Sequence, residues 1–506
     1  MIRNPVDSSK AIRFFAVLGL LALLTPLGGC STNPATGEQN FTAFMSPEKE
    51  AEVGSQEHPK ILEQYGGAYE DPRVNQYIRE LGLKLARQSE LPNLPYTFTV
   101  LNDDIVNAFA LPGGFVYISR GLLGAATNEA EVAGVLAHEI GHITARHTAQ
   151  RYSSAQAANI GLTVLGVLGS IAGVPTGTGQ LASFGAQAWL QSFSREQELE
   201  ADMLGVRYMT RVGYDPQGMV TFFQKLQENK RLTAELSGDP EAADRYSIMD
   251  THPRTAERII QAGQLAEATP VSSPKTGQLA FYQVADGLLY GDDPKEGIRE
   301  GRTFSHPDLK MTFTVPEGFE IFNGKTAVVA RDNNGAVIVF DMGKPKNLAE
   351  AGSVTSYLTR SWASKLKVSV SGVERINVNG LDAATGISRV NTRDGKKDAR
   401  FIALHDQAND RLFRLLFLTP PDRTKDLTTD LQRMTYSFRL LSDREAAEIK
   451  PLRIRIHKVR QGETVRSIAE KMPFPTRREE RFRVLNGFGP EDQINPGQRV
   501  KIVTKG

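Results

Sequence analysis

The segment His138-Glu139-Ile140-Gly141-His142 contains two histidines four residues apart, with a glutamate directly after the first. On an α-helix, residues i and i+4 share one face and lie about 6 Å apart along the axis. The imidazoles of His138 and His142 can therefore bind one metal ion. Glu139 points in a neighbouring direction and can act on a water. This spacing is typical of zinc hydrolases.

The residues around this segment predict that it is helical. Asn128 with Glu131 three residues later is typical of a helix N-terminus. Apolar residues then recur at helical spacing, namely Val132, Val135, Leu136, Ile140 and Ile143. We expect one helix over residues 128–148.

The sequence after the second histidine excludes one class of zinc peptidase. A metzincin would need glycine at position 145 and a third histidine at position 148. The chain has Ala145 and Thr148 instead. His147 is one position out of register, and we interpret it as a surface or packing histidine. A third ligand is therefore expected from another segment.

A second acidic helix is predicted downstream. Ser194 and Gln197 form a capping-box pattern, and the helix that they begin should end near Gly213. Residues four apart on this helix share a face, which brings two of its acids together.

Four acids on this helix are candidates for the metal site. Glu198 can bind the metal, while Asp202 on the same face can hold a histidine ligand through its other ring nitrogen. Glu196 and Glu200 are alternatives for the ligand role. The four acids could also form an ordinary solvated face.

Together, the two motifs resemble those of the M48 family of zinc metallopeptidases, which are gluzincins. The resemblance extends over about residues 40–265. It is carried by His138–His142 with Arg146-His147, and by Ser194-Arg195 with Glu198-x-x-Ala201-Asp202.

The resemblance implies a mainly helical zincin domain with a small β-sheet, which we place at residues 30–265. It implies one Zn²⁺ per chain. The residues that it assigns to the site are the ligands His138, His142 and Glu198, the general base Glu139, and Asp202 behind a ligand or as a proton donor.

A hairpin is predicted at residues 105–120, around the turn Pro112-Gly113-Gly114. An exposed edge strand there could hold an extended peptide through backbone hydrogen bonds. In the family, the residue matching Asn107 lies near the scissile bond. An ordinary hairpin is the alternative.

His252 and Arg258 form a further candidate pair. In the family, the matching histidine and arginine lie near the metal, where they can stabilise an oxyanion. In some periplasmic members, the histidine instead occupies the fourth position on zinc and blocks the enzyme. Both roles remain open for His252.

The first residues predict export and lipidation. Three cations, at positions 3, 10 and 13, precede the apolar run 14–24, which is too short to span a bilayer but suits a signal peptide. Leu27-Gly28-Gly29-Cys30 resembles a lipobox, so residues 1–29 are expected to be cleaved and Cys30 lipidated. Ser31 then favours anchoring at the outer membrane of a Gram-negative bacterium, facing the periplasm. Cys30 is the only cysteine, which excludes an intrachain disulfide.

The remaining sequence predicts two more domains after a linker at 266–303. Residues 304–445 contain short alternating strands with one helical stretch, typical of an α+β domain with an antiparallel sheet. We expect a protein-binding role for it. Residues 451–506 resemble a LysM module, which implies a βααβ fold and binding to peptidoglycan. This segment has 13 Lys and Arg against 6 Asp and Glu, which favours an anionic cell wall.

The sequence thus predicts a multidomain, lipid-anchored zinc metalloendopeptidase that cleaves misassembled or damaged envelope proteins. The alternative is a non-catalytic or latent scaffold that is bound to peptidoglycan through its C-terminal module. The formal net charge of the whole chain is only +2, so it gives no electrostatic reason to expect nucleic acid as a partner.

Overall fold

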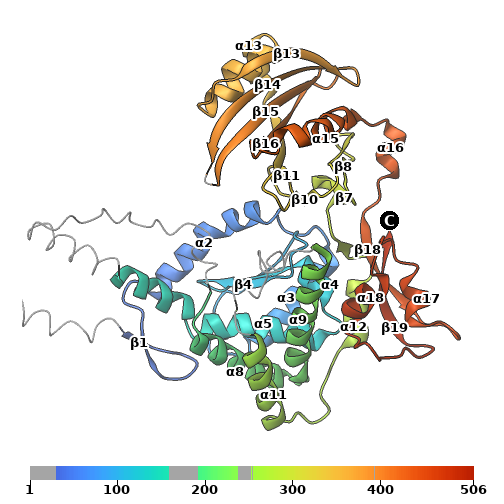
Figure 1. Cartoon of the computed structure of the whole chain (residues 1–506). Coiled ribbons are helices and arrows are strands. Elements are labelled where there is room, and N and C mark those ends of the chain that lie inside the picture. Colours follow the sequence, from blue (N-terminus) through green and yellow to red (C-terminus); the bar gives the residue numbers. More distant parts are fainter. Residues whose placement is uncertain (1–29, 159–191, 238–251, 253–254, 393) are drawn as a thin grey trace, which may run out of the picture. The chain divides into compact units, whose positions relative to one another are not determined.

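The computed structural model describes residues 30–158, 192–237, 252 and 255–506, except 393. The chain forms two compact units (Figure 1). The first contains residues up to Leu288 together with Arg455–Ile502, and the second contains Leu289–Ile454 with Val503–Gly506. The expected signal peptide lies outside the described residues. Within the described part, we find no helix that combines the length and hydropathy needed to cross a bilayer.

The first unit is mainly helical, as expected for the peptidase region. Its helices are α2 (Pro47–Gln64), α3 (Pro72–Ala86), α4 (Arg120–Ala125), α5 (Glu129–Thr144), α8 (Arg195–Val212), α9 (Gln217–Ser237), α11 (Thr255–Ala268) and α12 (Gln278–Ala285). Helix α5 lies at the centre and packs against α3, α8 and α9. Nearly all of its residues are buried, because apolar side chains surround the histidine motif on every face.

The predicted start of α5 is confirmed, but its predicted end is wrong. The Asn128 side chain accepts the backbone N–H of Glu131 at 3.0 Å. The helix ends at Thr144 because Arg146 adopts a left-handed backbone with φ 57°, after which residues 147–158 are helical again. Tertiary contacts of the Arg146 guanidinium hold this break: it donates to the carbonyl of Met45 at 2.7 Å.

A three-stranded sheet completes the peptidase region. Its strands are β3 (Thr97–Leu101), β4 (Ala108–Leu111) and β5 (Phe115–Ser119), in the order β3-β5-β4. The predicted hairpin is confirmed, since β4 and β5 pair antiparallel. Its turn requires glycine at 113, where φ is 79° and an added Cβ would lie 2.7 Å from the Cα of Ala51. Strand β4 is an edge of this sheet.

A short hairpin that the sequence did not predict precedes the helices. Strands β1 (Cys30–Thr32) and β2 (Gln39–Phe41) pair antiparallel, with Cys30 opposite Phe41. We call residues 30–41 the N-terminal hairpin.

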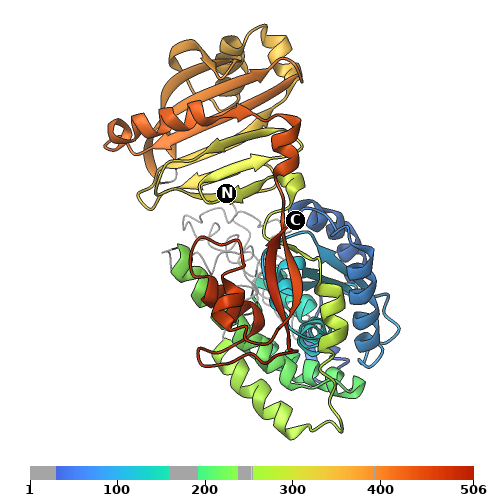
Figure 2. The ribbon, with the colours of Figure 1, turned by 90° about the vertical axis from the view of Figure 1, so that its right-hand side faces the viewer.

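Most of the C-terminal segment belongs to the first unit. Its elements are β18 (Leu452–Lys458), α17 (Val465–Ala469), α18 (Arg478–Asn486) and β19 (Arg499–Lys505), in the expected βααβ order. Figure 2 shows the two long red strands side by side, with the red helices beside them. Helix α18 contacts α4 and α9. The buried Lys501 donates to the carbonyls of Gly124 at 2.6 Å and Ala126 at 2.5 Å, so this segment packs on the peptidase helices. Its assignment to the LysM family stays a prediction.

The segment 266–303, expected to be a linker, is folded. It contains α12, whose Phe281 and Tyr282 are buried against α3 and α5. It also contains β6 (Leu289–Tyr290) and β7 (Ile298–Glu300), which pair with strands of the second unit. The apolar side chains of α12 explain the difference, because they form part of the first unit's core.

The second unit has the antiparallel sheets expected of an α+β domain, with helices beyond the one helical stretch that was predicted. Its seven-stranded sheet has the order β10-β11-β12-β16-β15-β14-β13, and a four-stranded sheet has the order β17-β9-β8-β7. The strands are β8 (Thr303–His306), β9 (Met311–Thr314), β10 (Glu320–Asn323), β11 (Val328–Arg331), β12 (Val337–Gly343), β13 (Ser371–Val378), β14 (Leu381–Thr392), β15 (Gly395–Asp406), β16 (Arg411–Thr419) and β17 (Arg439–Leu440). The helices include α13 (Pro345–Ala351), α15 (Thr424–Ser437) and α16 (Asp443–Glu448).

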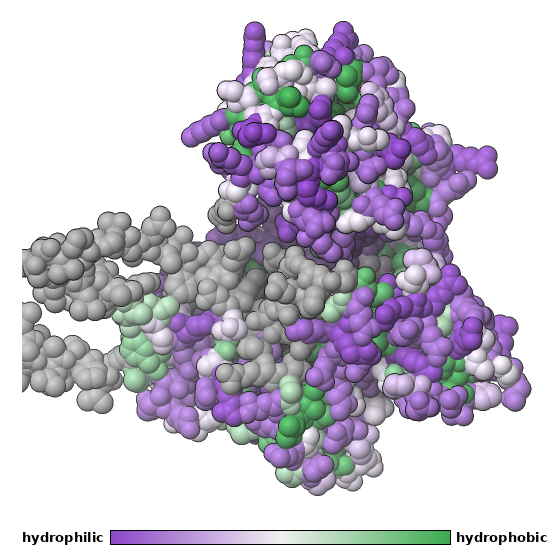
Figure 3. Space-filling view, in the orientation of Figure 1, coloured by the Kyte–Doolittle hydropathy of each residue, from purple (hydrophilic) through white to green (hydrophobic). Residues whose placement is uncertain are grey.

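The surface in view in Figure 3 is mostly hydrophilic, with hydrophobic residues scattered over it. Exposed single apolar residues are normal for a folded chain and identify no binding face by themselves.

Candidate metal centre

Close packing of α5 on α8 brings the two sequence motifs together. A Cβ added at Gly141 would lie 3.0 Å from the carbonyl oxygen of Ala201 and 3.3 Å from the Cβ of Leu204. The absence of a side chain at Gly141 therefore lets α8 approach α5. Helix α8 begins as predicted, with the Ser194–Gln197 capping box, and ends before the left-handed Gly213.

Four buried side chains converge between these helices. His138, His142, Glu198 and His252 each offer one ligand atom, and these atoms all lie within 4.8 Å of one another. The Nε2 atoms of His138 and His142 are 3.0 Å apart. Glu198 Oε2 lies 3.5 Å from Nε2 of His138, and Glu198 Oε1 lies 3.6 Å from Nε2 of His142. Imidazole nitrogens with one carboxylate are the donor set of catalytic zinc sites.

The polar atoms around this cluster fit a metal and a reacting water. Both carboxylate oxygens of Glu139 are buried and have no hydrogen-bond partner among the described residues, and the same holds for Nε2 of His252. Unpaired buried polar atoms are costly and are usually explained by a ligand. Burial raises the pKa of Glu139 above its usual value, although the nearby His252 and His138 oppose that rise.

His138 is held by a carboxylate and a guanidinium. Asp202 Oδ1 lies 2.8 Å from Nδ1 of His138, and Arg258 donates to both oxygens of Asp202, at 2.8 and 2.7 Å. Burial opposes ionisation of Asp202, but Arg258 and His138 hold its pKa down to about 2. Arg258 Nη1 also lies 3.0 Å from Glu198 Oε2. This guanidinium is therefore bonded to two site carboxylates.

His252 lies among the ligands. Its Nδ1 is 2.9 Å from Glu198 Oε1 and 3.2 Å from Nε2 of His138. Its Nε2 is 3.4 Å from Glu139 Oε1. Burial alone would lower the pKa of His252, but Glu198 and Glu139 raise it above the usual value.

His147 is buried beside His142, which excludes the surface alternative of its interpretation as a surface or packing histidine. It is fully buried, with Nδ1 2.8 Å from Nδ1 of His142 and Nε2 3.1 Å from Glu200 Oε2. Glu200 is thereby placed behind the metal ligands rather than among them. Glu196 is exposed. The only sequence signal for His147 was its position in the Arg146-His147 pair of the family motif.

An aromatic residue that the sequence did not single out covers His142. The ring of Phe193 stacks on that imidazole, with centroids 3.9 Å apart and an interplanar angle of 18°. The guanidinium of Arg151 lies 4.4 Å from the centroid of the Phe193 ring. Nothing in the local pattern around residue 193 signals this role.

Asn107 lies directly before the edge strand β4. Its backbone N–H donates to Ser119 Oγ at 3.1 Å, and its carbonyl accepts the backbone N–H of Ser119 at 2.9 Å. Its side-chain Oδ1 is buried and has no hydrogen-bond partner among the described residues. Asn107 thus has an acceptor free at the start of the strand predicted to hold substrate.

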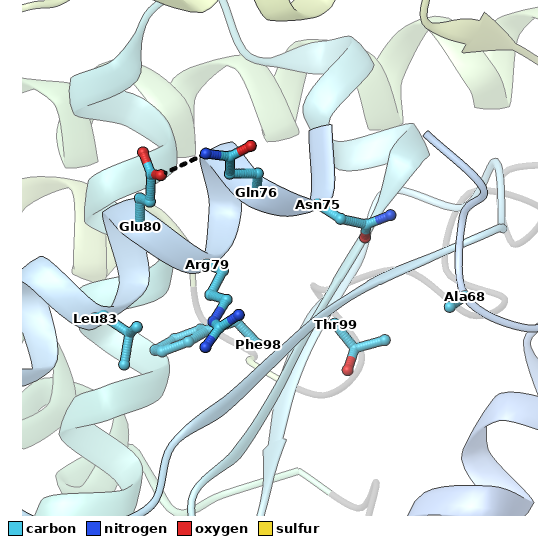
Figure 4. Close-up of a pocket in the computed structure, with 8 residues that line it drawn as sticks. All are labelled: Ala68, Asn75, Gln76, Arg79, Glu80, Leu83, Phe98 and Thr99. Atoms are coloured by element: carbon cyan, nitrogen blue, oxygen red, sulfur yellow. Dashed lines mark hydrogen bonds between the residues drawn. The ribbon is translucent and has the colours of Figure 1, made fainter. Parts of the chain in front are cut away.

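A separate hollow of about 680 Å³ lies beside α3 and β3 (Figure 4). Its lining is Ala68, Asn75, Gln76, Arg79, Glu80, Leu83, Phe98 and Thr99. Gln76 donates to Glu80 at 2.8 Å. None of these residues belongs to the metal cluster or to the predicted site, so the hollow is not the candidate centre.

Residues 72–266 match the family model described as Peptidase family M48. The matched stretch includes the α5 histidines, Glu198 and Asp202 on α8, and both His252 and Arg258.

Curated relatives match over a similar length of the chain. The beta-barrel assembly-enhancing protease of Escherichia coli K12 is 38% identical over 200 residues, which cover 38% of this chain and 39% of that protein. A mitochondrial metalloendopeptidase of Arabidopsis thaliana is 32% identical over 203 residues, covering 39% of this chain and 38% of that protein. The chain thus spans about two fifths of the length of these relatives.

Among solved structures, PsbP of Synechocystis is similar at a TM-score of 0.23 and 16% identity, covering 28% of this chain and 98% of that one. A similarity that low identifies no fold.

Proposed function

We propose that the protein is a zinc metalloendopeptidase that cleaves misassembled or damaged envelope proteins in the periplasm, a proposal supported by the match of residues 72–266 to the model of peptidase family M48. The observation that carries this proposal is the buried convergence of His138, His142 and Glu198 beside the unpaired carboxylate of Glu139. The similarity to the beta-barrel assembly-enhancing protease of Escherichia coli supports the envelope as the site of action.

Zinc bound by His138, His142 and Glu198 would polarise the scissile carbonyl and activate a water. Glu139 would accept a proton from that water and donate it to the leaving amine. Its burial supports this second step, because a raised pKa favours the protonated carboxyl.

Asp202 and Arg258 have supporting roles in this proposal. The 2.8 Å contact of Asp202 with Nδ1 of His138 leaves Nε2 of that ring facing the metal. Arg258 holds Asp202 and Glu198 in place. We also propose that Arg258 contacts the oxyanion once substrate is bound.

For His252, we propose the blocking role. Its ring lies within the ligand cluster and also contacts Glu139, so it would occupy the place where water and base must meet. Replacement of His252 by alanine is then expected to raise basal cleavage of casein. Loss of cleavage would assign His252 to the oxyanion instead, and unchanged cleavage would remove it from the mechanism.

We propose that the substrate pairs as an extended strand along β4, beside Asn107. The unpaired Oδ1 of Asn107 supports this, because it can accept a substrate N–H. The Asn107→Ala variant should show a raised KM for a peptide substrate with unchanged zinc content. An unchanged KM would contradict the placement.

We propose that Cys30 carries a lipid anchor in the outer membrane. Its exposure supports this, because acylation needs an accessible thiol. In a Gram-negative host, the wild type should fractionate with the outer membrane and Cys30→Ser with the soluble periplasm. A Cys30→Ser protein that stays in the membrane would refute the anchor.

The βααβ segment 451–506 is proposed to bind peptidoglycan. The purified full chain should co-sediment with isolated peptidoglycan sacculi, and soluble chitin oligomers should compete. Recovery in the supernatant would refute this part alone.

The alternative function is a latent scaffold in the envelope, and the position of His252 among the ligands is the observation that favours it. The deciding experiment compares zinc content and cleavage of casein or unfolded porin by wild type and Glu139→Gln. We expect one zinc per chain in both proteins and cleavage by wild type only. Cleavage that survives Glu139→Gln contradicts the mechanism. Zinc without cleavage, in wild type and in His252→Ala, favours the scaffold.

A further inference from the structure

The second ring nitrogen of His142 leads into a chain of hydrogen bonds. His142 Nδ1 contacts His147 Nδ1 at 2.8 Å, and His147 Nε2 contacts Glu200 Oε2 at 3.1 Å. When Nε2 of His142 faces a metal, the ring proton is on Nδ1, and this N–H donates a hydrogen bond to Nδ1 of His147. Nδ1 of His147 is then an acceptor and its Nε2–H donates to Glu200. Donors and acceptors therefore alternate without conflict.

This chain of hydrogen bonds ends in the N-terminal hairpin. Asn33 Nδ2 donates to Glu200 Oε1 at 2.7 Å. The orientation of the amide follows from its other contact, because Asn33 Oδ1 accepts the backbone N–H of Ala35 at 2.9 Å. Asn33 is only 2% exposed. Its backbone is also fixed, since its N–H donates to the carbonyl of Glu38 at 2.7 Å.

The hairpin contacts the helix break that places His147 as well. Arg146, in its left-handed conformation, donates through Nη1 to Ser31 Oγ at 2.8 Å. Asn40 Nδ2 donates to the carbonyl of Ala145 at 3.4 Å. Residues on both strands of the hairpin therefore bind the two residues that separate α5 from His147.

The two histidines on α5 differ in how they are held. His138 contacts its carboxylate, Asp202, directly, and Arg258 fixes that carboxylate from α11. His142 reaches its carboxylate only through His147, and that carboxylate is fixed by Asn33. The outermost partner of a metal ligand therefore lies three residues from Cys30.

We propose that the N-terminal hairpin is a positioning element of the metal centre: Asn33 fixes Glu200, Glu200 fixes His147, and His147 fixes the imidazole of His142. The inference rests on the proposed zinc site but on neither its activity nor its substrate. With Cys30 as the lipid attachment point, the segment that anchors the protein also holds one side of the metal site.

Two amide-to-acid substitutions within the hairpin test this inference. Asn33→Asp keeps the acceptor for the N–H of Ala35 but replaces the donor to Glu200 with an oxygen. Gln39→Glu is the matched control, because within the described residues Gln39 Nε2 donates only to Thr32 Oγ1 of the opposite strand, at 2.9 Å. Each adds one negative charge, which by itself attracts Zn²⁺. A weaker affinity in Asn33→Asp alone therefore reports the disrupted contact between residue 33 and Glu200, which combines the lost hydrogen bond with the repulsion between two adjacent carboxylates.

The measurement is Zn²⁺ affinity of the full chain by competition with a chromophoric chelator. Partners behind metal ligands typically contribute about 10–100-fold in metal affinity, so we expect Asn33→Asp to weaken binding by about 10-fold and Gln39→Glu to leave it unchanged. The visible spectrum of the Co²⁺-loaded protein should change for Asn33→Asp only, because that spectrum reports ligand geometry.

A double-mutant cycle separates this positioning role from general stability. His147→Gln should weaken Zn²⁺ binding, and Asn33→Asp should add nothing further in that background, because the connection is already broken. Fully additive effects, or an unchanged affinity of Asn33→Asp, would overturn the inference and leave the proposed function intact. Conversely, Zn²⁺ binding with the predicted variant effects but no cleavage, by wild type or by His252→Ala, refutes the proposed function and leaves this inference standing.

Discussion

Replacement of Gly141 by alanine should weaken Zn²⁺ binding, because Gly141 lies where α5 packs against α8. Gly141 lies on α5 one residue before the proposed ligand His142. An added Cβ would meet the carbonyl oxygen and Cα of Ala201 at 3.0 and 3.2 Å, and the Cβ of Leu204 at 3.3 Å. Two of these atoms are backbone, so α8 itself has to move by a few tenths of an ångström. That movement carries Glu198 away from His138 and His142.

Two opposing effects set the size of the change in stability. Alanine favours the helix over glycine by about 1 kcal/mol. Overpacking of a tight core typically costs about 1–3 kcal/mol. We therefore expect the metal-free variant to lose about 0–2 kcal/mol, a small change. Zn²⁺ affinity should fall more than stability does. The displacement of α8 changes the ligand geometry directly, and the higher helix propensity of alanine does not offset that change.

Gly263 provides the matched control. It lies in α11, and a Cβ added there meets no atom within 4 Å. Gly263→Ala should therefore raise stability by up to about 1 kcal/mol and leave Zn²⁺ affinity unchanged. Urea unfolding of the chelator-treated proteins and chelator competition for Zn²⁺ measure the two quantities. A Gly141→Ala protein that is stabilised like Gly263→Ala and binds Zn²⁺ like wild type would refute the reasoning.

Three further predictions concern other buried polar groups. Glu131→Gln leaves the mostly buried Lys225, 2.5 Å from Glu131, without its charge partner, so the urea midpoint should fall in line with a loss of about 3–5 kcal/mol; no shift would mean that the pair is solvated in solution. Lys501→Met leaves the carbonyls of Gly124 and Ala126 unpaired, at a cost of about 1–3 kcal/mol, so limited proteolysis should release the C-terminal segment sooner than in the exposed control Lys505→Met. Because the pKa of His252 is raised, it holds more proton at pH 7 than an ordinary histidine, and Zn²⁺ uptake should expel that proton. Calorimetry in buffers of different ionisation enthalpy should then show less proton release for His252→Ala, and equal release would exclude His252 as a ligand.

Local signals in the sequence predicted α8 almost residue by residue. The Ser194–Gln197 capping box and the left-handed Gly213 bound the helix where expected, because both act within one turn of their own position. Likewise, the start of α5 follows from Asn128 with Glu131 three residues later. Such caps need no knowledge of the rest of the fold.

Contacts distant in the sequence caused the errors. The expected end of α5 at 148 failed because Arg146 binds Ser31 and Met45, which are 115 and 101 residues away. This break turns His147 towards His142, and the helical spacing of the sequence does not predict that contact. Asn33, which donates to Glu200, is 167 residues away from it, so the role of the N-terminal hairpin could not be predicted either.

Charge balance explains why the predicted ligands and His252 gather at one point. Glu139, Glu198 and Asp202 are all buried, and Arg258 is bonded to the last two only. Among the described side chains, the one cation that can contact Glu139 directly is a protonated His252, whose Nε2 lies 3.4 Å from Glu139 Oε1. A buried carboxylate without compensation is strongly unfavourable, so the proton on His252, a divalent cation or protonation of Glu139 itself must relieve its charge. The same two acids that raise the pKa of His252 therefore attract the metal, and the proton and the metal compete for one site.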